Sequence, residues 1–215
     1  PLLSEFPRLW GQTLGLISFG HVAKAVSIRA KAFGLRLIAY DPYIEELSMT
    51  EYGVQPISTL EEMLSMSDIV SMHAPSTADA FHLMSEPQFK AMKPTALFIN
   101  NGRGPTVDEK ALIKALEQGW IAGAGLDVFA SEPLAEDSPL RSVERGLVLT
   151  PHLGASTEEA QENVAIDVAE QIRDVLLGLP ARSAVNIPGL SADIMEQLKP
   201  HLQLAVGGQP VRSPC

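Results

Sequence analysis

Apolar residues occur along this chain in short runs rich in Val, Ile and Leu, and longer segments of mixed apolar and polar residues separate the runs. A short apolar run bounded by turn residues is typical of a strand buried on both faces of a parallel sheet. We therefore expect strands at 13–18, 35–40, 68–72, 95–100, 121–127 and 146–150.

The segments between these runs repeat their apolar positions with the period of an α-helix, most clearly over 21–33, 108–118 and 156–178. Asp108 is the expected N-cap of the second helix, and Ser156 or Thr157 that of the third. On the first helix we expect one buried stripe of Val22, Ala25, Val26, Ala30 and Phe33.

Strands that alternate with helices predict repeated βαβ units, and hence the α/β class with a doubly wound parallel sheet of Rossmann type. The chain has 215 residues, of which 46% are hydrophobic, enough for one sizeable core. We expect a dinucleotide-binding domain over 1–180, a return segment over 181–205 and a disordered tail over 206–215.

Charge and cysteine content exclude several classes of function. A formal net charge of −10 disfavours a nucleic-acid ligand, which requires a basic face. One cysteine, Cys215, forms no internal disulfide framework, which favours a reducing, cytoplasmic compartment. No apolar run is long enough to predict a membrane span. The five histidines lack paired ligand spacing, so no metal site is predicted.

A dinucleotide-binding turn is predicted where the first strand meets the first helix. The segment Ser18-Phe19-Gly20-His21-Val22-Ala23 stands where a G-x-G-x-x-G/A turn is expected, with Ser18 in place of the first glycine. If the backbone of Ser18 needs a positive φ, its side chain costs about 1 kcal/mol and weakens cofactor affinity. Gly20 lets the pyrophosphate approach, and the N–H groups of His21 and Val22 bind it.

Asp41 ends the second predicted strand, 21 residues after Gly20, which is close to the spacing of the carboxylate that binds the adenosine ribose. A carboxylate at this position repels a 2′-phosphate. We therefore expect NAD rather than NADP as the cofactor.

Three residues that follow predicted strands have the side chains that reduction of a 2-keto acid requires. Arg103 lies in NNGRGPTVDE, Glu132 in GLDVFASEPL and His152 in PHLGAST. The reaction needs a cation for the carboxylate, an acid for the forming alkoxide, and a carboxylate to orient that acid. Doubly wound sheets bind ligands at the carboxyl ends of their strands, where all three residues are expected.

These motifs carry a resemblance to a known family. AKAFGLRLIAYDPY, DIVSMHAPST, KPTALFINNGRGPTVDEKALIKAL, AGAGLDVFASEPL and LTPHLGAST follow the order and spacing of the NAD-dependent D-isomer-specific 2-hydroxyacid dehydrogenases, closest to their phosphoglycerate dehydrogenase branch. The resemblance implies that Arg103 clamps the substrate carboxylate. It also implies that His152 is the general acid and base, and that Glu132 holds the imidazole.

The same resemblance implies the remaining cofactor contacts, from the pyrophosphate to the carboxamide. With Arg103 and His152 themselves beside the nicotinamide, the full set is Ser18, Gly20, His21, Val22, Asp41, Ala74, Pro75, Asn101, Gly102, Arg103, Asp127, His152, Gly154 and Ala155. The implied substrates are 3-phosphoglycerate and 3-phosphohydroxypyruvate of serine biosynthesis. Glyoxylate or hydroxypyruvate reductase and D-lactate activity stay open, and so does a non-catalytic NAD-sensing binding protein resembling transcriptional corepressors. A structural remnant of the fold is a third interpretation.

The resemblance further implies a homodimer, for which we expect an apolar contact surface around 120–145. In this family the first hundred or so residues belong to a substrate domain, and the segment at residue 1 resembles the helix that enters the nucleotide domain. We therefore expect this chain to bind NAD and to turn over poorly.

Overall fold

A computed structural model describes residues 8–179, 198 and 201, and the chain divides into two compact units, one ending at Gly154 and the other beginning at Ala155. Each unit is described by itself. The predicted return segment 181–205, apart from Leu198 and His201, and the predicted tail 206–215 lie outside the described residues.

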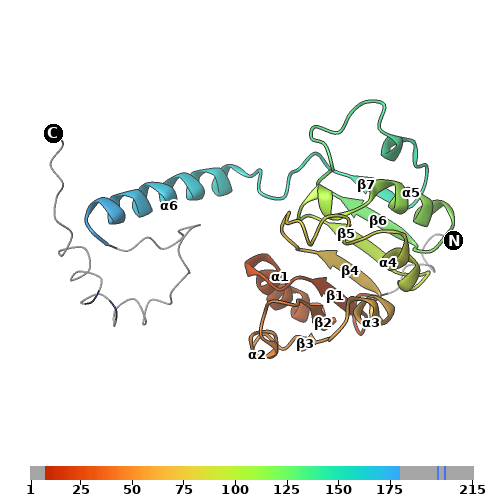
Figure 1. The fold of residues 1–215 in the computed structure, drawn as a ribbon, viewed down its shortest axis with the longest axis horizontal. Helices are drawn as coiled ribbons and strands as arrows, with labels where there is room; N and C mark the ends of the chain where they lie inside the picture. The colour runs from red at the N-terminus through yellow and green to blue at the C-terminus, as the bar shows by residue number, and fades with distance from the viewer. Residues whose placement is uncertain (1–7, 180–197, 199–200, 202–215) are drawn as a thin grey trace. The chain divides into compact units, whose positions relative to one another are not determined.

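The first unit contains a seven-stranded sheet in which every pair of neighbouring strands is parallel, in the order β3-β2-β1-β4-β5-β6-β7 (Figure 1). The strands are β1 (Thr13–Ile17), β2 (Arg36–Tyr40), β3 (Gln55–Pro56), β4 (Ile69–Met72), β5 (Leu97–Asn100), β6 (Gly123–Leu126) and β7 (Leu147–Leu149). The doubly wound class and all six predicted strands are confirmed. Only β3 was not predicted, because two residues give no apolar run.

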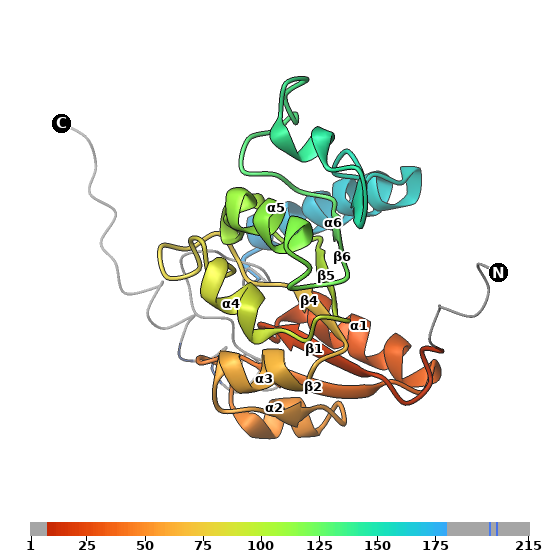
Figure 2. The same ribbon diagram turned by 90° about the vertical axis from the view of Figure 1, so that its right-hand side faces the viewer.

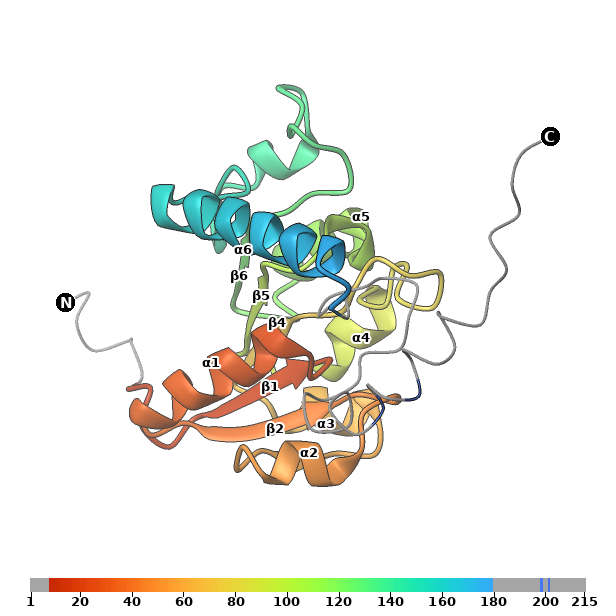
Figure 3. The same cartoon turned by 90° about the vertical axis from the view of Figure 1, so that its left-hand side faces the viewer.

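Helices lie on both faces of this sheet, with α1 on one face beside β1 and β2, and α3, α4 and α5 on the other (Figures 2 and 3). Their bounds are α1 (His21–Ala32), α2 (Glu46–Thr50), α3 (Leu60–Met66), α4 (Glu86–Ala91) and α5 (Glu109–Glu117). The predicted cap of α5 is confirmed, since the Asp108 carboxylate accepts hydrogen bonds from the N–H groups of Lys110 and Ala111. The chain order β-α-β therefore builds two helical layers around one sheet.

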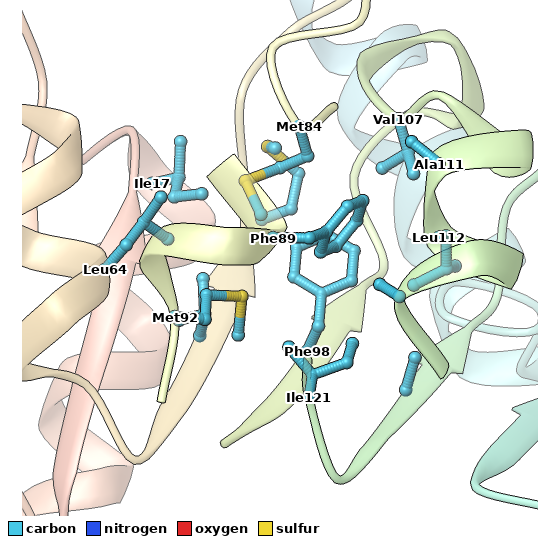
Figure 4. Packing of buried hydrophobic residues seen from close by; sticks show 14 of the residues in the cluster. Ile17, Leu64, Met84, Phe89, Met92, Phe98, Val107, Ala111, Leu112 and Ile121 are labelled. Carbon is cyan, nitrogen blue, oxygen red and sulfur yellow. The ribbon is translucent and has the colours of Figure 1, made fainter. Parts of the chain in front are cut away.

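Each face of the sheet buries its own hydrophobic cluster, because successive side chains of a strand point to opposite faces. Leu16 packs into the cluster beneath α1, and its neighbour Ile17 packs into the cluster beneath α3, α4 and α5. In the larger cluster the rings of Phe89 and Phe98 meet edge to face, with 5.4 Å between their centroids (Figure 4). These clusters fix the strands whose carboxyl ends carry the predicted site.

Helix α1 buries only part of the predicted stripe. Ala23, Ser27 and Ala30 are buried, whereas Val22 and Phe33 are 63% and 62% exposed. Small side chains line the contact because they let the helix approach the sheet closely. The prediction is confirmed for Ala30, and Val26 is half-buried against the same cluster. It was wrong for Val22, Ala25 and Phe33, because it ranked positions by hydrophobicity alone.

The prediction of an exposed apolar contact surface around 120–145 is also wrong. Ile121, Val128, Phe129 and Leu140 are buried, and the large apolar side chains of this segment that the structure describes are buried or half-buried. They turn inward to complete the core beneath α5. The described segment therefore has no exposed large apolar side chain of the kind the prediction required.

The second unit contains helix α6 (Glu158–Leu176), which agrees with the helix predicted over 156–178. Of the two expected caps, Thr157 is the one observed, and its hydroxyl accepts a hydrogen bond of 3.1 Å from the N–H of Ala160. Across residues 8–179, 198 and 201, no helix has the length and apolar character needed to cross a bilayer.

Candidate active site

His152 and Glu132 form a hydrogen bond beside the carboxyl ends of β6 and β7. The imidazole Nδ1 lies 2.6 Å from Glu132 Oε2. Since a carboxylate only accepts hydrogen bonds, Nδ1 carries the proton and donates it. The bond with His152, together with a bond of 3.0 Å from the N–H of Phe129, holds the pKa of the Glu132 carboxyl below its ordinary value. The Glu132 carboxylate therefore keeps its negative charge beside the imidazole.

The loop that carries His152 is held by Asp127, which is 5% exposed and follows β6. Asp127 Oδ1 accepts hydrogen bonds from the Thr150 hydroxyl and from the N–H of Leu153. Its Oδ2 accepts one of 2.8 Å from the N–H of Gly154. Burial alone would raise the pKa of Asp127, but these hydrogen bonds outweigh it and lower the pKa. A charged carboxylate thus fixes the loop around His152, whose backbone has a φ of 54°.

Arg103 lies on a tight turn after β5 that buried polar side chains hold in place. The amide of Asn100, which is fully buried, accepts from the N–H of Gly102 at 2.9 Å and donates to the carbonyl of Arg103 at 3.1 Å. The Thr106 hydroxyl donates to the same carbonyl at 2.6 Å. The guanidinium is exposed, and it forms no ion pair with any residue of the described ranges. This turn therefore presents a cation at the edge of the sheet.

Gly104 brings the Arg103 turn against the loop that carries Glu132. A Cβ at position 104 would overlap the backbone carbonyl of Phe129 and the N–H of Ala130. Only glycine permits this approach. The structure thus joins His152 to Glu132 by a direct contact and brings the Arg103 turn beside the Glu132 loop through backbone packing.

A hollow of about 580 Å³ opens beside the His152–Glu132 pair. Phe129, Leu149 and Arg141 are among its lining residues, and Arg103 is not. Arg141 holds the segment that follows Glu132, since its Nε and Nη2 donate to the carbonyls of Ala135 and Leu134. The hollow has the mixed apolar and charged lining typical of small-molecule sites.

The predicted dinucleotide turn has the geometry that a pyrophosphate needs. Ser18 has a φ of 70°, the positive value on which its predicted strain depends. A Cβ on Gly20 would meet no atom within 4 Å, so space is open in front of the turn. Among the described residues no side chain caps the N-terminus of α1, where His21 and Val22 are exposed. These features fit an anion held by backbone N–H groups.

Asp41 follows β2 and lies against this turn. Its Oδ2 accepts hydrogen bonds from the Ser18 hydroxyl at 3.0 Å and the N–H of Phe19 at 2.8 Å. Its Oδ1 accepts one of 2.8 Å from the N–H of Tyr43. The carboxylate thus lies where an adenosine ribose beside the turn would meet it, and the residues of the turn and of β2 together fit a dinucleotide.

The other predicted cofactor residues lie on loops after parallel strands, and hence at the same edge of the sheet. Ala74 and Pro75 follow β4, Asn101 and Gly102 follow β5, and Gly154 follows β7. Ala155 belongs to the second unit, and the cofactor roles of all these residues stay predictions.

Sequence reasoning missed Asn100, Thr106 and Thr150 as residues that shape the site. Asn100 carried a signal, because an Asn-Asn-Gly segment after a strand favours a turn in which the side chain bonds its own backbone. The sequence gives no such indication for Thr106 or Thr150, since each forms a hydrogen bond with a partner that only the fold brings near.

A doubly wound sheet with an anion-binding turn at its first strand and a carboxylate-bound histidine at its carboxyl edge defines a dinucleotide-dependent enzyme domain. Residues 4–154 match the family model "D-isomer specific 2-hydroxyacid dehydrogenase, NAD binding domain". The chain belongs to this family and carries its NAD-binding domain.

Similar proteins and solved structures support the assignment to this family. D-3-phosphoglycerate dehydrogenase of Synechocystis sp. is 51% identical over 198 residues, covering 92% of this chain and 35% of that protein. Glyoxylate reductase of Korarchaeum cryptofilum is 44% identical over 172 residues, covering 80% of this chain and 51% of that protein. The NAD-complexed D-isomer specific 2-hydroxyacid dehydrogenase of Lactobacillus delbrueckii ssp. bulgaricus is 33% identical with a TM-score of 0.72, covering 84% of this chain and 58% of that one. The chain thus spans about a third to a half of the length of these curated relatives.

Proposed function

We propose that this chain binds NAD and serves the interconversion of a D-2-hydroxy acid and its 2-keto acid, with 3-phosphoglycerate and 3-phosphohydroxypyruvate as the substrate pair. The observation that carries the proposal is the 2.6 Å contact between Glu132 and His152, whose loop the buried Asp127 holds. The identity of 51% to a phosphoglycerate dehydrogenase supports the choice of substrate and, with it, a place in serine biosynthesis.

Each catalytic residue has one role in this proposal. The Arg103 guanidinium binds the substrate carboxylate and polarises the keto oxygen, a task that suits its planar fork. His152 Nε2 gives a proton to the alkoxide oxygen during reduction and takes it from the hydroxyl during oxidation. Glu132 orients the imidazole through Nδ1 and stabilises its charged form. NAD, when bound, supplies or accepts the hydride.

The cofactor contacts follow the strand ends along the sheet. The N–H groups of His21 and Val22 bind the pyrophosphate, with Gly20 giving it room, and Asp41 binds the adenosine ribose. The Ala74–Pro75 segment borders the adenine side, and Asn101 and Gly102 lie at the nicotinamide ribose. Asp127, Gly154 and Ala155 complete the site near the carboxamide.

A chimera tests the catalytic part of this proposal. The 198-residue stretch of this chain that aligns with the Synechocystis relative replaces the matching segment of that protein, and NADH formation is measured with 3-phosphoglycerate. We expect activity that His152→Gln and Glu132→Gln reduce, while Glu144→Gln, a change at an exposed residue before β7, leaves it unaltered. A folded chimera that binds NAD and oxidises no 2-hydroxy acid would contradict the enzyme assignment and favour an NAD-sensing binding protein.

Reduction of glyoxylate is the second candidate, because the glyoxylate reductase of Korarchaeum cryptofilum is 44% identical to this chain over 172 residues. The same chimera separates the two activities when glyoxylate, hydroxypyruvate and 3-phosphohydroxypyruvate are compared by kcat/KM. A preference for glyoxylate would replace phosphoglycerate as the proposed substrate.

We further propose a cytoplasmic homodimer that binds neither nucleic acid nor membrane. The net charge of −10 and the single cysteine support this setting. Sedimentation of the purified chain at several concentrations tests the dimer, and a monomer at all of them would contradict it.

A further inference from the structure

We infer that the Ser18 hydroxyl competes with the adenosine ribose for the Asp41 carboxylate and thereby sets the affinity of the cofactor site. This inference rests on the proposed binding of NAD. Ser18 Oγ donates to Asp41 Oδ2 at 3.0 Å, and both side chains are partly buried. A glycine, the residue that the dinucleotide turn favours at this position, would make no such bond.

The bonds already made to Asp41 leave too few acceptor sites for a ribose diol. A carboxylate offers about four lone-pair sites, two on each oxygen. The Ser18 hydroxyl and the N–H of Phe19 occupy both sites of Oδ2, and the N–H of Tyr43 occupies one site of Oδ1. One acceptor site remains, on Oδ1. Two ribose hydroxyls that both donate to Asp41 need two acceptor sites.

The backbone bonds to Asp41 cannot yield to the ribose, but the Ser18 side chain can. The N–H groups of Phe19 and Tyr43 are parts of the turns that shape the site. The backbone of Ser18 is itself held, because its N–H donates to the carbonyl of Tyr40 at 2.8 Å. Rotation of the serine hydroxyl away from Oδ2 is therefore the step that admits the second ribose hydroxyl.

Two substitutions separate this competition from the backbone strain at the same residue. Ser18→Ala removes the hydroxyl and keeps a side chain at a φ of 70°, whereas Ser18→Gly removes both the hydroxyl and the strain. If the hydroxyl competes, both variants bind NAD more tightly than the wild type. If strain alone weakens binding, only Ser18→Gly does so.

Calorimetric titration of the 215-residue chain tests the inference with two ligands, NAD and an NAD whose adenosine ribose lacks the 2′-hydroxyl. We expect Ser18→Ala to lower the Kd for NAD about tenfold, the effect of one hydrogen bond to a charged group. We expect little change in Kd for the 2′-deoxy ligand, which needs only the site that is already vacant. Ser65→Ala, on the exposed surface of α3, is the matched control and should change neither Kd.

An NAD affinity that Ser18→Ala leaves unchanged or weakens would overturn the inference, and so would an equal gain for both ligands. These outcomes differ from failure of the proposed function. A wild-type chain that binds neither ligand would contradict NAD binding itself.

Discussion

Asp127 Oδ2 accepts a hydrogen bond of 2.8 Å from the backbone N–H of Gly154, and its other oxygen accepts from Thr150 and Leu153. Asp127 thus holds the loop on both sides of His152. The resemblance implied that Asp127 binds the cofactor carboxamide. Its geometry adds a second role, since three of its acceptor sites shape the loop.

Asp127→Asn should lower the free energy of unfolding by about 2–3 kcal/mol, because an amide cannot accept the bonds that both carboxylate oxygens now accept. Thr150→Val removes one of these bonds and should cost about 1 kcal/mol. Urea unfolding of the 215-residue chain measures both values. Equal stability of Asp127→Asn and the wild type would show that the loop does not depend on this carboxylate.

The pattern of apolar runs predicted the sheet because parallel strands are buried on both faces and leave an unbroken signal. The site was predicted in outline, since Ser18, Asp41, Arg103, Glu132 and His152 each follow a strand. The supports of the site could not be predicted in the same way. The partner of Thr150 lies 23 residues away and becomes its neighbour only when β6 and β7 pair.

The close contact of Gly104 with Phe129 predicts that adding a single methyl group at position 104 strongly destabilises the fold. Gly104→Ala places a Cβ inside the backbone of residues 129–130, so the Arg103 turn or the Glu132 loop must shift. We expect a loss of more than about 3 kcal/mol in the free energy of unfolding, beyond the range of most substitutions.

Gly125→Ala is the matched control, because a Cβ on that strand residue meets no atom within 4 Å and its φ is not positive. Urea unfolding should show no loss of stability for this variant. A similar loss for both variants would mean that the close approach at Gly104 does not cause the effect.

Arg103 should not be replaceable by lysine. Lysine keeps the positive charge but loses the planar fork that binds a carboxylate through two parallel hydrogen bonds. In the chimera with the Synechocystis relative, Arg103→Lys should lower kcat/KM for 3-phosphoglycerate about a hundredfold. Arg145→Lys, on an exposed turn, is the control. Full activity of Arg103→Lys would contradict the bidentate role.

His73 predicts a pH dependence of stability that is separate from catalysis. It follows β4, its N–H donates to the carbonyl of Ile17 at 2.9 Å, and its Nε2 lies 3.0 Å from the Ser71 hydroxyl. Burial lowers the pKa of His73 to about 4. In the unfolded chain a histidine has a pKa of about 6.5, so between these values the unfolded state binds a proton that the folded state does not.

Because the unfolded state gains this proton, the free energy of unfolding should fall as the pH decreases from about 6.5 to about 4, by roughly 3 kcal/mol in total. Above that window His73 contributes no pH dependence. His73→Gln should remove this contribution, whereas Ser71→Ala should keep it, since burial rather than the hydroxyl lowers the pKa. Urea unfolding at intervals across the window measures the slopes. The same slope in His73→Gln and the wild type would assign the acid sensitivity to other groups.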